Sequence, residues 1–144
     1  MYSHLDIRGQ IAETVVYKLQ LLGSTVEVQP RQVKFYKTEN GAIPFAEWLD
    51  SLDRQTRARI DARLAMVRET GNLGDCDPVG SGVFEMKDHY GAGYRIYFGQ
   101  IGREIVLLLC GGVKKSQNKD IRKAKDYWNN HLAMQKRKKS KGLS

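Results

Sequence analysis

The sequence has few of the residues that build disulfide frameworks, metal sites or membrane spans. It contains two cysteines and three histidines, and the cysteines do not lie at a zinc-ligand spacing. No stretch approaches the roughly 20 apolar residues that a membrane-spanning helix requires. The N-terminus lacks the basic start and apolar centre of a signal peptide. We therefore expect no metal, no cofactor and no membrane partner, and a chain that stays in a reducing cytoplasm.

Acidic residues are scarce in the last part of the chain. From residue 114 to residue 144, eleven Lys or Arg face two acids, whereas residues 1–113 carry thirteen against fourteen. The formal net charge of +8 is therefore carried by the C-terminal segment. Clustered cations bind polyanions by releasing phosphate counterions, but a charge run is also typical of a solvated tail. The charge alone leaves a nucleic acid, an anionic surface and a solubilising tail open.

The chain of 144 residues has the length and composition of one globular domain. A chain of this size buries roughly 70% of its unfolded surface and needs no covalent staple. Residues 1–25 are predicted to form an N-terminal extension, with apolar side chains near helical spacing from Ile7 to Leu22. Residues 26–134 form the main domain. Residues 135–144 carry five Lys or Arg and have little to bury, which predicts a basic disordered tail.

Two helices are predicted in the first half of the main domain. Pro44 stands where a first helical turn accepts proline, and the apolar side chains that follow recur at i, i+3, i+4 and i+7 up to Leu52. A second helix begins at Ser51 or Asp53 and ends at Gly71, a natural C-terminal stop. These segments predict a helical hairpin, followed by a loop over Asn72–Gly82.

After this loop the period of the apolar residues changes from 3.6 to 2. Val83–Lys87 and Tyr94–Phe98 alternate, and Ile105–Cys110 is apolar throughout. Together with a strand inside Val26–Lys37, they predict a four-stranded antiparallel or mixed sheet whose all-apolar strand is central and covered on both faces. The fold class is α+β, with the helical hairpin on one face of the sheet and a C-terminal helix over about residues 118–132.

The other face of the predicted sheet gathers charged and phenolic side chains. If the apolar side chains of the two alternating strands point toward the hairpin, their remaining side chains share the outward face. Two lysines follow the end of the all-apolar strand and lie beside this face. The candidate site residues are Arg95, Lys87, Lys114, Lys115, Tyr97 and Glu85. A guanidinium could clamp phosphodiester oxygens, the lysines could offset transition-state charge, and the phenol or the carboxylate could relay a proton. A solvated strand face shows the same alternation, and the spacing alone favours that interpretation.

Several short motifs, taken in order, resemble one known superfamily. They are Val33–Lys37 followed by Pro44–Leu49, Gly82–Lys87, Gly93–Phe98, Leu107–Gly112 and Lys114–Gln117. In this order and spacing, the chain from about residue 30 to residue 132 resembles the RelE/ParE superfamily of toxins. Within it, the chain is most similar to the HigB-like "addiction module killer protein" group of type II toxin-antitoxin systems. The first residues and the tail lie outside the resemblance.

The resemblance implies a RelE-like fold and a small cytoplasmic toxin. Such toxins are neutralised by a cognate antitoxin that carries a helix-turn-helix domain, through which the complex contacts operator DNA. RelE-like and HigB-like members enter the ribosomal A site and cleave mRNA by attack of a ribose 2′-OH on the adjacent phosphate, without a metal. The motif match implies Arg95 as the most secure functional position, followed by Lys114 and Lys115.

The sequence also departs from the family pattern. Lys87 stands where relatives often carry Arg, which keeps the charge but loses the bidentate fork. Val113–Lys115 stands where many relatives carry Asp-Lys-Ser, and Tyr97 or Glu85 is the candidate for proton transfer. Three functions stay open: a ribosome-dependent mRNA endoribonuclease, which leads; a ParE-like gyrase inhibitor without enzymatic activity; and an inactive nucleic-acid-binding or interaction protein on the same fold.

Overall fold

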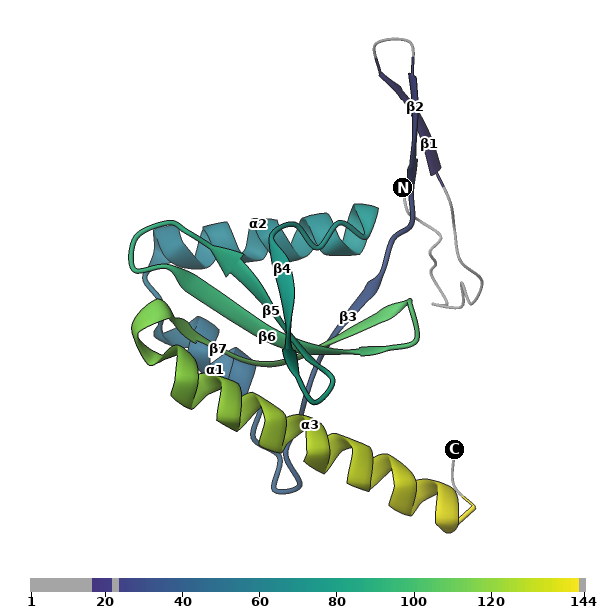
Figure 1. Ribbon diagram of the computed structural model, residues 1–144, viewed down its shortest axis with the longest axis vertical. Coiled ribbons are helices and arrows are strands. Elements are labelled where there is room, and N and C mark those ends of the chain that lie inside the picture. The colour runs from purple at the N-terminus through teal and green to yellow at the C-terminus, as the bar shows by residue number, and fades with distance from the viewer. Residues whose placement is uncertain (1–16, 22–23, 143–144) are drawn as a thin grey trace.

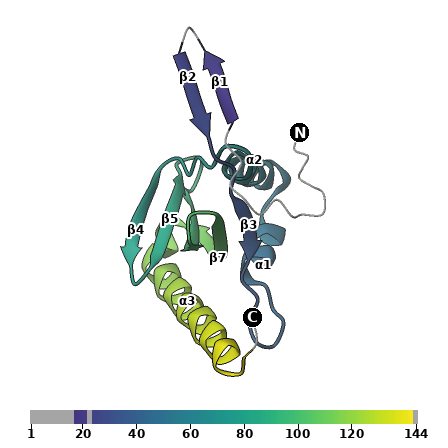
Figure 2. The ribbon, with the colours of Figure 1, turned by 90° about the vertical axis from the view of Figure 1, so that its right-hand side faces the viewer.

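The computed structural model of the chain describes residues 17–21 and 24–142. A five-stranded sheet in the order β3-β7-β6-β5-β4 lies at its centre, with helices on both faces (Figure 1, Figure 2). This arrangement confirms the predicted α+β class and is compatible with a RelE-like fold. The sheet has one strand more than predicted, because β4 (Cys76–Gly80) lies inside the expected loop. β4 was not predicted because it contains Pro78, and proline is rare inside strands. β4 lies at the edge of the sheet, where proline is tolerated.

The sheet is mixed, and one of its interior strands is apolar on both faces. The remaining strands are β3 (Gln32–Phe35), β5 (Val83–Asp88), β6 (Tyr94–Ile101) and β7 (Ile105–Val113). β3 runs parallel to β7, and the other neighbours are antiparallel. Val106–Cys110 of β7 is buried throughout, and β7 lies inside the sheet between β3 and β6, which confirms that this all-apolar strand is covered on both faces.

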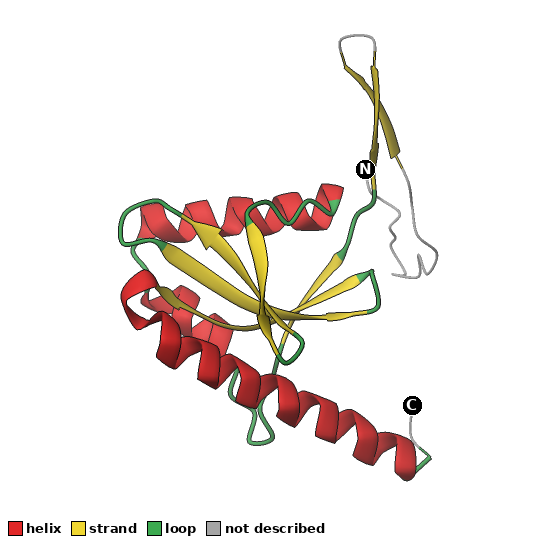
Figure 3. Ribbon diagram, in the orientation of Figure 1, coloured by secondary structure: helices red, strands yellow, loops and turns green. Residues whose placement is uncertain are grey.

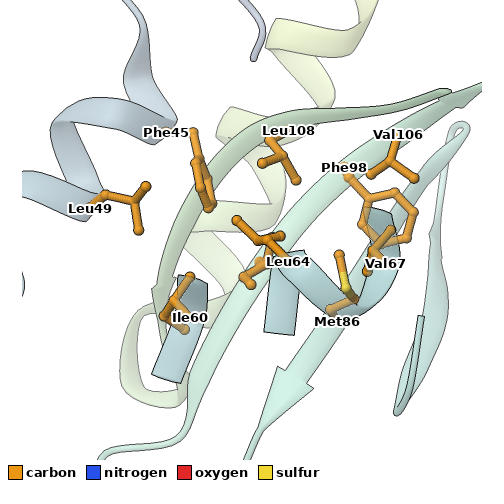
Figure 4. Close-up of a cluster of buried hydrophobic side chains, with 10 residues drawn as sticks. Phe45, Leu49, Ile60, Leu64, Val67, Met86, Phe98, Val106 and Leu108 are labelled. Carbon is orange, nitrogen blue, oxygen red and sulfur yellow. The ribbon is translucent and has the colours of Figure 1, made fainter. Parts of the chain in front are cut away.

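The predicted helical hairpin is confirmed as α1 (Pro44–Ser51) and α2 (Arg54–Thr70). Asp53 caps α2 by accepting a hydrogen bond from the backbone N–H of Thr56, and Gly71 ends it with a φ of 77°. Both helices pack on one face of the sheet and close an apolar core (Figure 4). Its buried members are Phe45, Leu49, Ile60, Leu64, Val67, Met86, Ile96, Phe98, Val106 and Leu108.

The opposite face of the sheet is covered by α3 (Gln117–Ser140), which follows the short helix η1 (Lys114–Ser116) (Figure 2, Figure 3). Ala124 and Trp128 of α3 are buried there against Tyr97 and other residues of a second apolar core. Gly99 makes room for this packing, since a Cβ at that position would lie 2.3 Å from the Trp128 ring. The expectation that this face is open to solvent is therefore wrong: the alternate side chains of β5 to β7 are matched by an apolar stripe on α3.

The last helix continues into the segment predicted to be a disordered tail. α3 ends only at Ser140, well past residue 135. Gln, Lys and Arg are strong helix formers, and cations are favoured near a helix C-terminus, so local preference extends the helix although nothing is buried there. Arg137 also forms an ion pair with Glu39, in the loop between β3 and α1.

A separate antiparallel hairpin precedes the main sheet, formed by β1 (Tyr17–Leu21) and β2 (Ser24–Val28) (Figure 1). The helix expected from Ile7 to Leu22 is therefore wrong over Tyr17–Leu21, and the rest of that prediction lies outside the described residues. The β-branched residues of β2 favour extended structure, and pairing with that strand gives Tyr17–Leu21 a hydrogen-bonding partner.

Candidate functional site

The structure brings together the four candidate residues of β5 and β6. In the antiparallel register Glu85 lies opposite Tyr97, and Lys87 lies opposite Arg95. Directly opposed residues point to the same face of a sheet, and this is the face that α3 covers. The period of 2 in the sequence therefore predicted the grouping correctly, because register on a two-faced sheet is set by that alternation.

Three of these four residues are buried rather than exposed. The exposed fraction of the residue is 0% for Tyr97, 2% for Glu85 and 5% for Arg95. The first turn of α3 reaches over them, since the side-chain amide of Gln117 donates to Oε2 of Glu85 over 2.7 Å. The predicted outward site is thus a polar layer between the sheet and α3.

Glu85 Oε2 is the shared acceptor of this polar layer. It accepts the hydroxyl of Tyr97 over 3.0 Å as well as the Gln117 amide, and Arg95 Nε lies 3.6 Å from it as an ion pair. Burial, and then the hydrogen bond to Glu85, raise the pKa of Tyr97 well above its usual value. The phenol of Tyr97 therefore stays protonated and acts as a donor.

The guanidinium of Arg95 is the least satisfied group of the layer. Its Nε and Nη1 atoms are buried and have no hydrogen-bond partner in the part of the chain that the structure describes. The carboxylate of Glu85 compensates the charge, but 3.6 Å is too long for a hydrogen bond. Because a guanidinium is a charged donor, the unfilled N–H groups on these two nitrogens suit the oxygens of a phosphate.

Lys114 and Lys115 are exposed in η1, and Lys114 lies beside Arg95. The backbone N–H of Lys114 donates to the carbonyl of Gly93 over 2.7 Å, which ties η1 to the turn before β6. A Cβ at Gly93 would lie 3.3 Å from Cβ of Lys114 and 3.7 Å from Nη1 of Arg95. Gly93, with a φ of 79°, therefore allows both cations to approach the same turn.

Lys87 lies at the edge of this group and is engaged elsewhere. Its Nζ atom contacts Asp77 over 2.8 Å, and this hydrogen bond raises the pKa of Lys87. Its side chain is 25% exposed, and the ion pair with Asp77 partly neutralises its charge at the surface. An open depression of about 400 Å³ between α2 and the end of β5 is lined by Arg63, Met66 and Lys87, and Arg95 is not part of its lining.

Gln117 and Asp120 belong to the site, and sequence reasoning missed both. Gln117 reaches Glu85 across 32 positions of sequence, a contact that no local pattern marks. Asp120 is 6% exposed and accepts from the hydroxyl of Ser116 over 2.5 Å. A Cβ at Gly112 would lie 1.9 Å from Asp120 Oδ2, so the missing side chain of this glycine leaves room for the carboxylate. The available signal was an acidic residue in a first helical turn, where it is favoured by the helix dipole.

Metal or thiol chemistry would need suitable groups among residues 17–21 and 24–142. No group of three His, Cys, Asp or Glu could hold a metal ion there. Cys110 is buried in the second core, and burial raises the pKa of its thiol to about 12, so it stays a protonated core side chain. Within the same residues, no helix has the length and apolarity needed to cross a membrane.

Comparison with known proteins assigns the family. Residues 47–129 match the family described as phage derived protein Gp49-like (DUF891), a segment that contains all six candidate site residues. The chain belongs to the Gp49-like family. Gp49-like proteins are toxins of the RelE/HigB-like, toxin-antitoxin type, which implies an antitoxin partner for this chain.

The chain also has a relative in Haemophilus influenzae. That uncharacterized protein is 40% identical to this Gp49-like chain over 84 residues, which are 58% of this chain and 84% of the relative. The family match begins within α1 and ends within α3. The strands β1 to β3 and the end of α3 therefore lie outside the matched segment of this Gp49-like protein.

Proposed function

We propose that this Gp49-like protein is the toxin of a type II toxin-antitoxin system of the HigB-like branch, and that it arrests translation by cleaving mRNA on the ribosome. The observation that supports this most is the guanidinium of Arg95, which holds two buried nitrogens without a hydrogen-bond acceptor beside the exposed Lys114. This is also the position at which the family resemblance implies a functional arginine.

The proposed reaction is the attack of a ribose 2′-OH on the adjacent phosphate. The 2′ oxygen bonds to phosphorus while its proton passes to water, the bond from phosphorus to the 5′ oxygen breaks, and that oxygen takes a proton from water. The products are a 2′,3′-cyclic phosphate and a 5′-hydroxyl. Negative charge builds up on the nonbridging oxygens, where the fork of Arg95 would bind and where Lys114 and Lys115 would supply further positive charge.

Burial changes the roles proposed for the remaining candidates. Glu85 and Tyr97 are covered by α3, and Glu85 contacts both Arg95 and Tyr97. We therefore assign the two residues to positioning the guanidinium rather than to proton transfer. Lys87 contributes charge at the edge of the site, reduced by its pair with Asp77. Access of RNA to Arg95 requires η1 and the first turn of α3 to shift, because Gln117 closes the layer.

Induction in cells with mapping of mRNA 5′ ends tests the proposal. Wild type should arrest growth and produce codon-linked cuts. Arg95→Ala should reduce cutting by about 100-fold or more, the usual effect of removing one preorganised donor. Arg95→Lys keeps the charge but loses the fork and should be intermediate. Arg54→Ala, which removes an exposed arginine of α2, is the matched control and should behave as wild type.

Because Arg95 is buried, the experiment includes a variant that leaves the core intact. Lys114→Ala truncates an exposed side chain beside Arg95 and should reduce cutting while circular dichroism stays unchanged. Equal toxicity of wild type and Arg95→Ala without codon-linked cuts would overturn the catalytic assignment. The alternative of a gyrase inhibitor would instead produce an SOS response and linearised plasmid with intact mRNA. The absence of growth arrest would indicate an inactive protein.

A further inference from the structure

The positive charge of α3 and its flanks is almost entirely unpaired. Eleven Lys or Arg lie between Lys114 and Lys141, and among the described residues only Arg137 of this stretch forms an ion pair, with Glu39. Asp120, one of the two acids in the stretch, is buried against Ser116. The surface of the helix therefore carries a strong positive potential that the protein itself does not neutralise.

These cations form two groups along the helix. The proximal group adjoins the Arg95 site and consists of Lys114, Lys115, Lys119, Arg122, Lys123 and Lys125. The distal patch consists of Lys136, Arg137, Lys138, Lys139 and Lys141. No Lys or Arg lies between the groups, and a rise of about 1.5 Å per residue separates Lys125 from Lys136 by about 16 Å. The two groups can therefore contact separate parts of one polyanion.

The distal patch lies where α3 has left the sheet (Figure 1). Met134 is the last residue packed against the second core, and every residue from Gln135 to Gly142 is exposed. Successive helical residues are rotated by about 100°, so the four consecutive cations from Lys136 to Lys139 surround the helix. This end of the helix has no apolar face, which a membrane-surface helix would need.

We propose that the distal patch is a docking site for the phosphate backbone of double-helical RNA, which holds the toxin beside the strand that it cuts. This inference rests on the proposed function, since it takes RNA as the polyanion. Duplex RNA is recognised mostly through its shape and backbone, and flexible lysines bind phosphates as point charges without reading bases. The patch lies beyond the family match at residues 47–129, so it is an addition to the matched part of the chain.

Salt-dependent binding of an RNA hairpin of about 20 base pairs to the purified full chain tests the proposal. The variant K136Q/K138Q/K139Q/K141Q removes four cations, leaves Arg137 to pair with Glu39, and keeps strong helix formers in α3. The slope of log K against log salt should become shallower by about 3 to 4, and affinity at about 0.1 M salt should fall at least about tenfold. Replacing the same four lysines with arginine should preserve both.

The matched control is R54Q/R57Q/R68Q/R103Q, which removes the same charge from exposed positions on α2 and in the β6–β7 turn. It should lower affinity by a few-fold at most. Loss of affinity in the control equal to that of the distal variant would overturn the proposal, because binding would then follow net charge. Wild-type RNA binding by the distal variant, or equal binding of duplex DNA, would overturn it as well.

The assay separates this inference from the proposed function because it uses neither ribosomes nor cleavage. Arg95→Ala should bind the hairpin with a nearly unchanged salt slope, since it leaves the distal patch intact. If the distal variant binds RNA as the wild type does and still makes codon-linked cuts, only the docking site is refuted. A distal patch that binds RNA in a chain that makes no cuts would refute only the ribonuclease.

Discussion

Glu85 is the residue on which the polar layer depends. A single carboxylate oxygen accepts the Tyr97 hydroxyl and the Gln117 amide and faces the buried Arg95 at 3.6 Å. A buried charge that loses its counter-ion is strongly destabilising, whereas replacing a whole buried pair with apolar groups is often nearly neutral. Glu85 is therefore a positioning residue. We expect its removal to lower the free energy of unfolding, and to affect cleavage only through the position of Arg95.

Replacing Glu85 with Gln should lower the free energy of unfolding by about 3–5 kcal/mol, the usual effect of breaking a buried ion pair. The double variant Glu85→Gln/Arg95→Met should be more stable than Glu85→Gln alone, because the uncompensated guanidinium is gone. Urea unfolding of the wild type, both single variants and the double variant measures this as a double-mutant cycle. Simple additivity of the two single effects would show that Glu85 and Arg95 do not interact.

At the scale of elements, α2 is the helix whose limits follow most directly from local chemistry. Asp53, one of the two starting residues that the sequence offers, caps its first turn, and Gly71 ends it in the left-handed region as predicted. α3 shows the opposite case: its start was predicted, but its end and the face that it covers were not. The difference arises because caps act within a few residues, whereas α3 is positioned by strands far away in sequence.

The cap of α2 gives a pH dependence that can be measured. The hydrogen bond from the Thr56 backbone N–H lowers the pKa of Asp53, so the folded state favours the carboxylate. A lowered folded pKa stabilises the fold above the unfolded pKa, and this contribution is lost as pH falls below about 4. Asp53→Asn keeps a capping acceptor that does not titrate. The stability of wild type relative to Asp53→Asn should therefore fall between pH 7 and pH 3.

Thermal unfolding of wild type, Asp53→Asn and Asp53→Ala over this pH range checks the prediction. Asp53→Ala removes the acceptor and should lower Tm by a few degrees at neutral pH. The comparison with Asp53→Asn cancels the contribution of the other carboxylates. A difference between wild type and Asp53→Asn that does not change with pH would contradict the role given to the Asp53 charge.

At the scale of the whole molecule, two helical layers enclose one sheet, and the cations of the C-terminal segment lie on the α3 side. The helical hairpin closes one core, α3 closes the other, and the polar layer of Glu85, Arg95 and Tyr97 lies at one end of the second. Lys114 and Lys115 are exposed where this layer meets the surface. An antitoxin that blocks Arg95 therefore has to cover or immobilise η1.

We expect the cognate antitoxin to protect Lys114 and Lys115 from acetylation. Its binding over η1 would remove both exposed side chains from solvent, while Lys136 in the distal patch should react as in the free toxin and serves as the internal control. Mass spectrometry of acetylated toxin, free and in complex, provides the measurement. Unchanged reactivity of Lys114 and Lys115 would place the antitoxin elsewhere, and the helical hairpin would then be the expected surface.

The chain alone determined the features that depend on neighbours in sequence. The period of 3.6 and the capping residues predicted α1 and α2, and the period of 2 placed Glu85, Lys87, Arg95 and Tyr97 on one face of the sheet. Only the tertiary structure decided that α3 covers this face and that Gln117 reaches Glu85. Burial is a property of surfaces brought together from distant parts of the chain. The same cluster that alternation predicts as an exposed site is therefore, in the folded protein, a buried layer around an arginine with two unfilled hydrogen-bond donors.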